Sequence, residues 1–240
     1  MHFFVDFDGT ITKTDVVDLI LDRFASNKWK KVEEEWTQGR IGSRECLSRQ
    51  IALVSVTKEE FFRLINEVEI DPYFVSFLKR SKAYGVPVTI VSDGFKIVIE
   101  EILKRALKNS PDLLRQLPVF SNRLEWVNGR LKACFPDGPS CEHGCANCKS
   151  KVIARHHKGG EKIVFVGDGL SDRFAAAAAD LTFAKIGANG RSPLLKFCEE
   201  KKINHKKYTS FKDIEEWVVK YFTDSHTVRY NKKAYLVEKN

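Results

Sequence analysis

The sequence predicts an α/β protein: a doubly wound, Rossmann-like parallel sheet that carries a small helical cap domain. Three short apolar runs end in turns that contain Asp and Gly, at residues 3–5, 86–91 and 163–166. Such runs between helical patterns are typical of buried parallel strands, and alternating strands and helices form doubly wound sheets. Residues 14–84 instead contain helical patterns without a strand. We therefore expect a helical insertion after the first strand and a cleft between this insertion and the sheet.

Local signals within the insertion support its helical character. Residues 57–60 (Thr-Lys-Glu-Glu) form a capping box before an apolar-periodic stretch. Asp71 followed by proline starts another helix, and Gly85 ends it before the second strand. These signals predict a helical cap over residues 14–84 and a catalytic core made of residues 1–13 and 85–222.

The second half of the chain is predicted to add a strand, a hairpin and a last helix. Residues 181–184 read as a further strand, and Asn128-Gly129 lies between apolar residues as a hairpin turn. An amphipathic helix starts at Ser210, and its pattern decays after Phe222. We expect residues 223–240 to form a polar, basic tail with a weakly strand-like end.

Composition places the chain among globular proteins and restricts its partners. Its 240 residues are 43% hydrophobic and 30% charged, and no apolar run reaches the roughly 18 residues of a membrane span. No basic-then-apolar leader precedes the first strand, so we expect a cytoplasmic protein with no membrane partner. The net charge is +8, and residues 201–240 hold ten Lys and Arg against five Asp and Glu. A solvated tail explains this excess better than a nucleic-acid partner. The sequence makes no prediction of oligomeric state.

The acidic turns at the predicted strand ends indicate a metal site. Asp6 and Asp8 are two residues apart on a strand, so their side chains face the same way. Asp168 and Asp172 follow another strand of the same sheet. Four carboxylates at one edge need a cation to offset their repulsion, and oxygen ligands favour Mg²⁺. Ser92, with its glycine-containing turn, offers a hydroxyl and amide donors for an anion.

These segments together resemble the four ordered motifs of the haloacid dehalogenase-like phosphatases. The motifs are residues 6–10 (Asp-Phe-Asp-Gly-Thr), 92–94 (Ser-Asp-Gly), Lys149 and 167–172 (Gly-Asp-Gly-Leu-Ser-Asp). The resemblance spans about residues 1–222, and the insertion is similar to the helical cap of the subclass that includes phosphoserine phosphatase. It implies a haloacid dehalogenase-like core and a phosphatase activity on a small phosphorylated metabolite.

The resemblance also implies a role for each motif residue. Asp6 is expected to attack phosphorus and form an aspartyl-phosphate. Asp8 is expected to act as general acid and then general base, and its main-chain carbonyl to bind Mg²⁺. Asp6 and Asp168 complete the expected metal ligands, with Asp172 binding directly or through water.

Phosphate binding is expected to involve three residues of the second and third motifs. Ser92 and the main-chain N–H of Asp93 would hold phosphate oxygens. Lys149 would offset the charge between the nucleophile and the phosphate, with Lys151 as its less favoured rival. Asp93 stands where the family often has glycine, and its extra carboxylate is expected to affect substrate preference rather than activity.

The substrate is the least determined part of this interpretation. Residues 145–149, 179–184 and the helix from Ser210 resemble the methionine-salvage branch of the family. This implies 2-hydroxy-3-keto-5-methylthiopentenyl-1-phosphate as first choice, with phosphoserine, phosphoethanolamine or phosphocholine as alternatives. Asp15 aligns with the position where phosphoserine phosphatases bind the substrate ammonium, although it also suits a helix start. Three cap arginines are candidates for binding a substrate carboxylate: Arg40, Arg44 and Arg49.

A cysteine-rich segment precedes the candidate lysine. Cys134, Cys141, Cys145 and Cys148 lie close together, with His143 among them, and their spacing suits a structural Zn²⁺ site. The alternative is a loop of buried thiols that positions Lys149. Two non-enzymatic alternatives also remain at this point: a metal-stapled binding module with vestigial turns, and a nucleic-acid binder that uses the tail.

Overall fold

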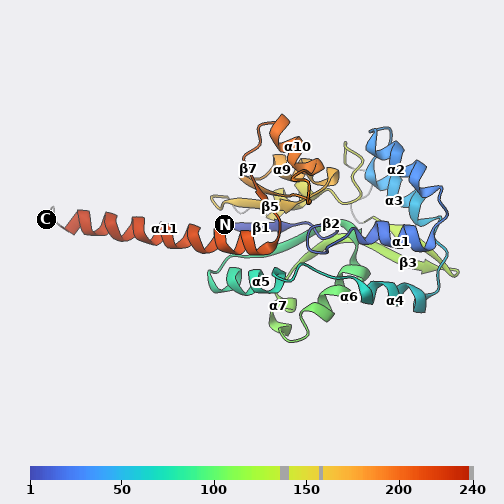
Figure 1. Ribbon diagram of the computed structural model, residues 1–240, viewed down its shortest axis with the longest axis horizontal. Helices are drawn as coiled ribbons and strands as arrows, with labels where there is room; N and C mark the ends of the chain where they lie inside the picture. The colour runs from blue at the N-terminus through green and yellow to red at the C-terminus, as the bar shows by residue number, and fades with distance from the viewer. Residues whose placement is uncertain (136–140, 157–158, 238–240) are drawn as a thin grey trace.

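The computed structural model describes the backbone of residues 1–135, 141–156 and 159–237, and the side chains of the described residues up to 224. Seven strands form one sheet in the order β4-β3-β2-β1-β5-β6-β7, and all neighbours are parallel except β3 and β4. The predicted doubly wound α/β fold is thereby confirmed (Figure 1). The strands are β1 (His2–Val5), β2 (Val88–Phe95), β3 (Val119–Val127), β4 (Arg130–Cys134), β5 (Ile163–Gly167), β6 (Leu181–Lys185) and β7 (His205–Tyr208).

The central position of β1 brings distant motifs together. Val5 pairs with Ile90 of β2 on one side and with Val166 of β5 on the other. The strands are parallel, so their C-terminal ends lie at the same edge, where open α/β sheets bind ligands. β2 itself continues through the second motif to Phe95, and its register with β3 shifts between Val91 and Phe95. The register shift therefore falls within the second motif.

Five helices connect β1 to β2: α1 (Val16–Phe24), α2 (Trp29–Thr37), α3 (Ser43–Ile51), α4 (Lys58–Glu67) and α5 (Phe74–Ala83). The first four lie beyond one end of the sheet (Figure 1). The predicted capping box is present at the start of α4, where Thr57 Oγ1 accepts from the Glu60 N–H and the Glu60 carboxylate accepts from the Thr57 N–H. α5 instead packs on the core, because the rings of Phe74 and Phe77 lie 5.0 and 5.1 Å from that of Phe211. A cap that ends before α5 therefore fits the packing better than one that ends at residue 84.

The remaining helices cover both faces of the sheet. They are α6 (Lys96–Ala106), α7 (Pro111–Arg115), α8 (Lys149–His156), α9 (Arg173–Ala177), α10 (Pro193–Glu200) and α11 (Phe211–Val237), with a 3₁₀ turn at Leu170–Asp172. In Figure 1, α9 and α10 lie above the sheet, and α5, α6 and α7 lie below it. The predicted hairpin joins β3 to β4, with Asn128 and Gly129 both at positive φ (50° and 76°). None of the helices in the described part of the chain is long and apolar enough to cross a membrane.

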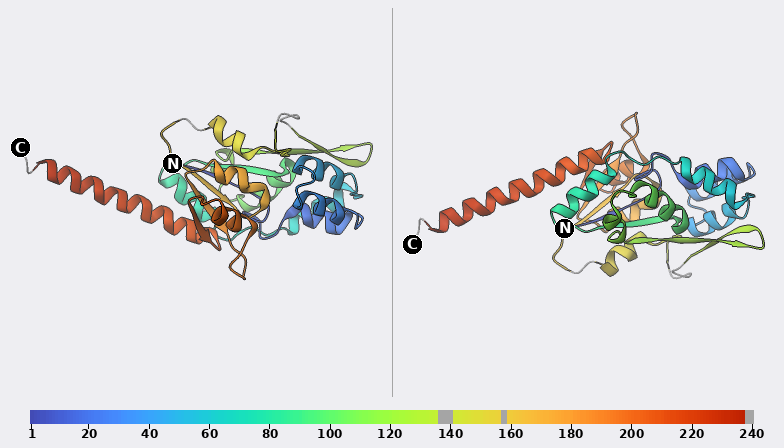
Figure 2. Two further views of the ribbon diagram at one scale, coloured as in Figure 1. Left: turned by 90° about the horizontal axis from the view of Figure 1, so that it is seen from above. Right: turned by 90° about the horizontal axis from the view of Figure 1, so that it is seen from below.

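The C-terminal segment corrects one expectation. A tail with a weakly strand-like end was expected after Phe222, but α11 continues as one helix to Val237. Figure 2 shows this helix leaving the body of the protein as a single rod. Residues 211–240 contain no Gly or Pro, so nothing in the sequence breaks the helical hydrogen bonds after the amphipathic pattern ends.

Candidate active site

A small cavity lies where the C-terminal ends of β1, β2 and β5 face the cap. Its volume is about 140 Å³, which suits a small leaving group rather than a polymer. The charged motif residues that line it are Asp6, Asp8, Asp93, Lys149 and Asp168, and the motifs also contribute Gly94, Gly169, Leu170 and Ser171. The cap contributes Asp15, Val17, Asp18, Glu33, Trp36, Ser43, Cys46, Leu47 and Gln50. The fold therefore places the expected catalytic residues on one wall of the cavity and cap side chains on the other.

Lys149 connects two buried carboxylates on the floor of the cavity. Its Nζ lies 2.8 Å from Asp6 Oδ1 and 2.6 Å from Asp172 Oδ1. Burial favours the neutral lysine, but Asp172 and Asp6 outweigh it and hold the pKa of Lys149 well above its usual range. Lys151, the rival, is half-buried and does not line the cavity. The positive charge beside the expected nucleophile is thus that of Lys149.

Asp172 has three hydrogen-bond partners behind the floor. Its Oδ2 accepts from the N–H groups of Asp168 (3.0 Å) and Gly169 (3.1 Å), while Oδ1 faces Lys149. This arrangement holds the turn after β5 and the lysine in one unit. Three accepted hydrogen bonds leave Asp172 less free to bind a metal than Asp168, so its position favours an indirect role.

Asp168 faces the first motif across the cavity. Thr10 Oγ1 donates to Asp168 Oδ1 at 2.7 Å. Gly9 has φ of +70°, and a Cβ there would lie 2.6 Å from Asp168 Oδ2, so only glycine fits this turn beside the carboxylate. Burial, with Asp172 nearby, raises the pKa of Asp168 to about 7. The glycine thus allows a carboxylate from one motif to meet the backbone of another.

Asp8 lies where the first motif meets the second motif and the cap. Its Oδ1 accepts from the Val16 N–H at 3.2 Å, and its Oδ2 accepts from Ser92 Oγ at 3.2 Å. A Cβ on Gly94 would lie 2.3 Å from Asp8 Oδ2, so the second motif also needs glycine there. Burial, assisted by the charge of Asp15, raises the pKa of Asp8 to about 8. A carboxyl with this pKa is protonated at neutral pH and has a proton to donate to a leaving group.

The carboxylates fit a divalent cation. Oxygens of Asp6, Asp168 and Asp172 lie within 4.8 Å of one another. Burial, with Asp172 as the strongest repelling neighbour, raises the pKa of Asp6 well above its usual value even though Lys149 opposes this. Lys149 alone therefore does not offset the negative charge of the site. Hard oxygen ligands with excess negative charge are the donor set that Mg²⁺ prefers.

Asp93 ties the second motif to the cap. One carboxylate oxygen accepts from Ser43 Oγ at 2.9 Å, and the other accepts from the Asn147 N–H at 3.3 Å. Burial raises the pKa of Asp93. The carboxylate is thus engaged by α3 and by the segment before Lys149, which explains how a charged side chain is accommodated where the family often has glycine.

The cap wall is acidic. Asp15 caps α1 by accepting from the Asp18 N–H at 3.0 Å, and Glu33 accepts from Gln50 Nε2 at 2.9 Å. Although solvent reaches Asp18, the enclosing protein, together with Asp15, raises its pKa to about 7. Trp36 also lines the cavity. This wall presents carboxylates and an aromatic ring to whatever leaving group enters.

The three cap arginines do not line this cavity. Arg49 forms ion pairs with Glu35 (2.7 Å) and Glu45 (3.2 Å). Arg44 packs over the ring of Phe135 and donates to the Cys145 carbonyl. Arg40 lines a neighbouring groove. Among the described residues that line the cavity, Lys149 is the single cation.

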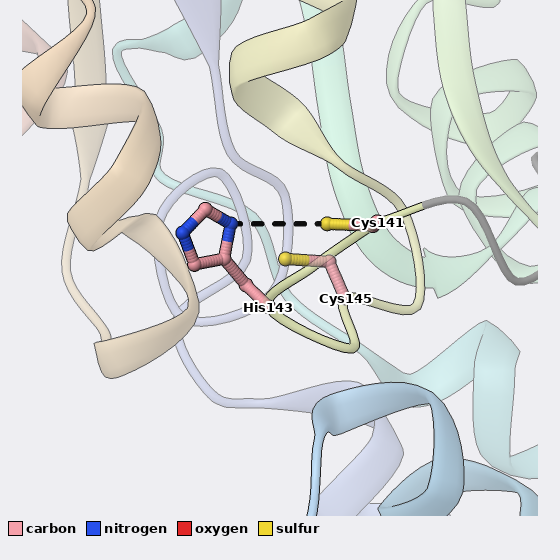
Figure 3. A group of neighbouring side chains, drawn as sticks. All are labelled: Cys141, His143 and Cys145. Carbon is pink, nitrogen blue, oxygen red and sulfur yellow. Dashed lines mark hydrogen bonds between the residues drawn. The ribbon is translucent and has the colours of Figure 1, made fainter.

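The cysteine segment forms a different group from the one expected. Cys141, His143 and Cys145 bring their ligand atoms within 4.8 Å of one another, and Figure 3 shows both thiols beside the imidazole. Burial opposes ionisation, but hydrogen bonds from the Cys145 and His143 backbone and from the Cys145 and Cys148 thiols lower the pKa of Cys141 to about 6. Cys134, at the end of β4, is outside this group of described side chains and has Glu125 as its neighbour.

Several supporting residues were not among the predicted site residues. Asn147 Nδ2 donates to the carbonyls of Ser92 (3.0 Å) and Phe120 (2.8 Å), and Asn122 donates to the Asp93 carbonyl (2.6 Å). Lys185 Nζ donates to the carbonyls of Gly9 (2.7 Å) and Thr10 (3.0 Å). Asn147 lies inside residues 145–149, so the resemblance of that segment could have identified it. Asn122 and Lys185 act on backbone atoms of distant segments, which only the folded chain reveals.

Comparison with known proteins places this geometry in a family. The sequence model of the haloacid dehalogenase-like hydrolases matches residues 3–177. The chain belongs to this family. A 2-hydroxy-3-keto-5-methylthiopentenyl-1-phosphate phosphatase of Bacillus pumilus (strain SAFR-032) is 27% identical over 229 residues, covering 90% of this chain and 94% of the relative. The Pdp3-interacting factor 1 of Schizosaccharomyces pombe is 28% identical over 233 residues, covering 94% and 97%.

Solved structures share the fold of this haloacid dehalogenase-like chain. A phosphoserine phosphatase carrying an analogue of its phospho-aspartyl intermediate superposes with a TM-score of 0.67 at 22% identity, over 90% of this chain and 97% of the other. A substrate-bound phosphoserine phosphatase gives the same TM-score at 21% identity, over 90% and 96%. These structures show that the chain shares the fold of the phosphoserine phosphatases.

Proposed function

We propose that this phosphatase is Mg²⁺-dependent and hydrolyses the phosphomonoester of a small metabolite through an aspartyl-phosphate at Asp6. One observation carries the proposal: the Asp6 carboxylate lies 2.8 Å from the buried Lys149 Nζ, in a cavity also lined by Asp8 and Asp168. A carboxylate held beside an ammonium group is positioned to attack an anionic phosphoryl group.

The proposed reaction has two steps, and Asp8 transfers the proton in each of them. An Asp6 carboxylate oxygen bonds to phosphorus, the bond to the leaving oxygen breaks, and Asp8 gives that oxygen its proton. The ionised Asp8 then takes a proton from water, whose oxygen attacks phosphorus and releases phosphate and the Asp6 carboxylate. The raised pKa of Asp8, about 8, supports the acid role in the first step.

Three groups of this chain would hold the metal. They are the Asp6 and Asp168 carboxylates and, as the family resemblance implies, the main-chain carbonyl of Asp8. Bound Mg²⁺ would supply positive charge to the phosphate oxygens. Asp172 would act from behind, because its oxygens already bind Lys149 and two main-chain amides.

The first-choice substrate is 2-hydroxy-3-keto-5-methylthiopentenyl-1-phosphate. Support comes from the names of relatives that are about 27% identical over nearly their whole length. Val17, Leu47 and Leu170 line the cavity and offer an apolar surface for a thioether.

A specific observation favours a second candidate, an ammonium-bearing phosphomonoester such as phosphoethanolamine or phosphocholine. Asp15, Asp18 and Glu33 line the cap side, and Trp36 adds an aromatic face that attracts cations. Phosphoserine fits less well, because no arginine lines the cavity to bind its carboxylate. The non-enzymatic binding module is set aside because the chain is a phosphatase of this family.

The test is a comparison of phosphomonoesters on Mg²⁺-depleted and Mg²⁺-restored enzyme. Dialysis into Mg²⁺-free buffer without chelator should abolish turnover, Mg²⁺ should restore it, and Ca²⁺ should restore it poorly because its larger coordination shell misplaces the phosphate. Beryllium fluoride should then label the Asp6 carboxylate. Full turnover in metal-free enzyme would overturn the metal proposal, and equal kcat/KM for all four candidate substrates would overturn the substrate proposal.

A further inference from the structure

The segment from Cys141 to Cys148 bridges the cap and the core next to the active site. Its Gly144 carbonyl accepts from the Arg44 N–H at 3.1 Å, and its Ala146 N–H donates to Ser43 Oγ at 2.8 Å. Gly42 packs so tightly against Gly144 that a Cβ would lie 2.5 Å from the Gly144 oxygen. This segment, which we call the bridging loop (residues 141–148), therefore contacts the start of α3 along its length.

The other end of the bridging loop leads directly into the catalytic machinery. Its Asn147 N–H donates to Asp93, and its last residue, Cys148, is followed by Lys149 at the start of α8. Cys148 is buried, and its carbonyl accepts from the Val152 N–H at 3.1 Å. Any displacement of this loop would move both the cap contact and the ammonium beside Asp6.

Three side chains of the bridging loop have the spacing of metal ligands. Cys141 Sγ lies 3.9 Å from His143 Nδ1, and Cys145 Sγ completes a group within 4.8 Å (Figure 3). Sulfur and nitrogen ligands of a tetrahedral zinc ion are separated by roughly 3.5 Å, since the metal lies about 2.0–2.3 Å from each. The 3.9 Å between Cys141 and His143 is close to this separation, and the whole group of three lies within 4.8 Å.

A fourth ligand is available next to these three. Cys148 follows Cys145 at the C-x₂-C spacing common in zinc sites. Its Sγ lies 3.4 Å from Ser150 Oγ and outside the group of three, so it has to turn toward that group to complete a set of four ligands. The His143 ring is held by Phe174 of α9, with ring centroids 3.8 Å apart. None of the four lines the catalytic cavity, so they are separate from the carboxylate site.

We propose that Cys141, His143, Cys145 and Cys148 bind a structural zinc ion that fixes the bridging loop between α3 and Lys149. Thiolate and imidazole ligands select zinc over the hard Mg²⁺ that suits the carboxylates. The ligand set differs from the sequence expectation, because His143 replaces Cys134. The zinc site does not depend on the proposed phosphatase substrate or on Mg²⁺.

Metal content and cobalt spectroscopy of the full chain test the proposal. Protein purified without chelator and dialysed against excess Mg²⁺ should retain about one equivalent of zinc. Replacement of that zinc by Co²⁺ should produce a thiolate-to-cobalt charge-transfer band and tetrahedral d–d bands, which the carboxylate site cannot give. Absence of both zinc and the charge-transfer band in protein reconstituted under reducing conditions would overturn the site.

Matched variants identify the ligands. Cys145→Ser and His143→Ala should each lower zinc content at least about tenfold, whereas the control Cys134→Ser should keep it. Equal loss in Cys134→Ser would overturn the assignment. If a ligand variant fails to fold, zinc release from wild-type protein by a mercurial reagent, with two or more thiols titrated per zinc, decides instead; release without thiol titration would refute the site.

A kinetic readout tests the link to Lys149. Selective zinc removal at saturating Mg²⁺ should lower kcat while the Mg²⁺ concentration for half-activity stays unchanged. Unchanged kcat in the zinc-free enzyme would refute the positioning role. If the enzyme had no activity with zinc or without it, the proposed function would be refuted, but the measurement of zinc content would still stand.

Discussion

The two walls of the cavity handle charge in opposite ways. On the core wall, every motif carboxylate has a partner from a distant segment: Lys149 for Asp6, Thr10 for Asp168, and Lys149 with two amides for Asp172. On the cap wall, the described donors to Asp15 and Glu33 are neutral: the Asp18 N–H for Asp15, and the Gln50 amide and Cys46 thiol for Glu33. The core wall is thus cross-linked by partners from distant segments, whereas the carboxylates of the cap wall have no cationic partner among these donors.

This difference separates chemistry from selectivity. A cross-linked wall is preorganised and needs no reorganisation as charge develops on phosphorus. A wall with unpaired carboxylates gains most when a cation enters, so it discriminates among leaving groups. Changes on the core wall should therefore lower turnover for all substrates, and changes on the cap wall should reorder substrates.

The largest effect is expected from Asp6→Asn. The amide keeps the size of the side chain but lacks the attacking charge, so kcat should fall about a thousandfold or more for every phosphomonoester tested. Single-turnover assays and circular dichroism would measure the loss and the retained fold. Residual turnover of more than a few per cent would contradict covalent catalysis at Asp6.

The next largest effect is expected when the loss of kcat and of stability in Lys149→Met is compared with that in Lys151→Met. Loss of Lys149 leaves Asp6 and Asp172 buried without their cation, which should cost about 3–5 kcal/mol in the free energy of unfolding and at least about a hundredfold in kcat. Lys151 does not line the cavity, so its variant should stay within a fewfold of wild type. Chemical denaturation and kinetics on both variants provide the measurement, and similar losses in the two would refute the assignment.

Asp168→Asn and Asp172→Asn should separate metal binding from positioning. Asp168→Asn should raise the Mg²⁺ concentration for half-activity by tenfold or more. Asp172→Asn should mainly lower kcat, because it loosens Lys149 and the turn after β5. Mg²⁺ titrations of activity distinguish the two, and a larger shift in Asp172→Asn would make it the stronger ligand.

On the cap wall, Glu33→Gln and Asp18→Asn should change selectivity. For phosphoethanolamine or phosphocholine each should raise KM several-fold, because a bound cation loses a carboxylate partner. For the methylthio enol phosphate the change should be small. Glu45→Gln is the matched control, since it removes a cap charge that pairs with Arg49 outside the cavity. If Glu33→Gln lowered kcat for all substrates, this would contradict the assignment of selectivity to the cap wall and chemistry to the core wall.

The smallest effect is a pH dependence of stability from Asp18. The enclosing protein, with Asp15 nearby, raises the pKa of Asp18 to about 7 from a usual 3.8 even though solvent reaches the side chain, so the folded chain binds its proton more tightly than the unfolded chain. Stability from this group is therefore lost as the pH rises from about 4 through about 7. Asp18→Asn should raise the Tm relative to wild type at pH 8 and by less at pH 5. A Tm difference independent of pH would contradict this.

Part of the fold and site was predictable because it depends on local patterns. Apolar runs that end in Asp and Gly identified β1, β2 and β5, a further short apolar run identified β6, and the Asn128-Gly129 turn identified the β3–β4 hairpin. The motif order predicted which carboxylates would share one edge. β7 was not predicted because its sequence, His-Lys-Lys-Tyr, is polar and the strand lies at the sheet edge. α11 was predicted too short because an amphipathic pattern indicates where a helix packs rather than where it ends.

By itself, the sequence determined the chemistry of this protein, because residue types within each motif and their spacing along strands dictate which charges share a strand end. Only the tertiary structure decided how those charges are shared. Lys149 is placed between Asp6 and Asp172, the Asp93 carboxylate is turned to Ser43, and His143 rather than Cys134 joins the thiols. The pairings of Lys149 and of Asp93 join residues that are distant along the chain. The thiols and His143 share one loop, but no local pattern encodes the directions in which their side chains meet.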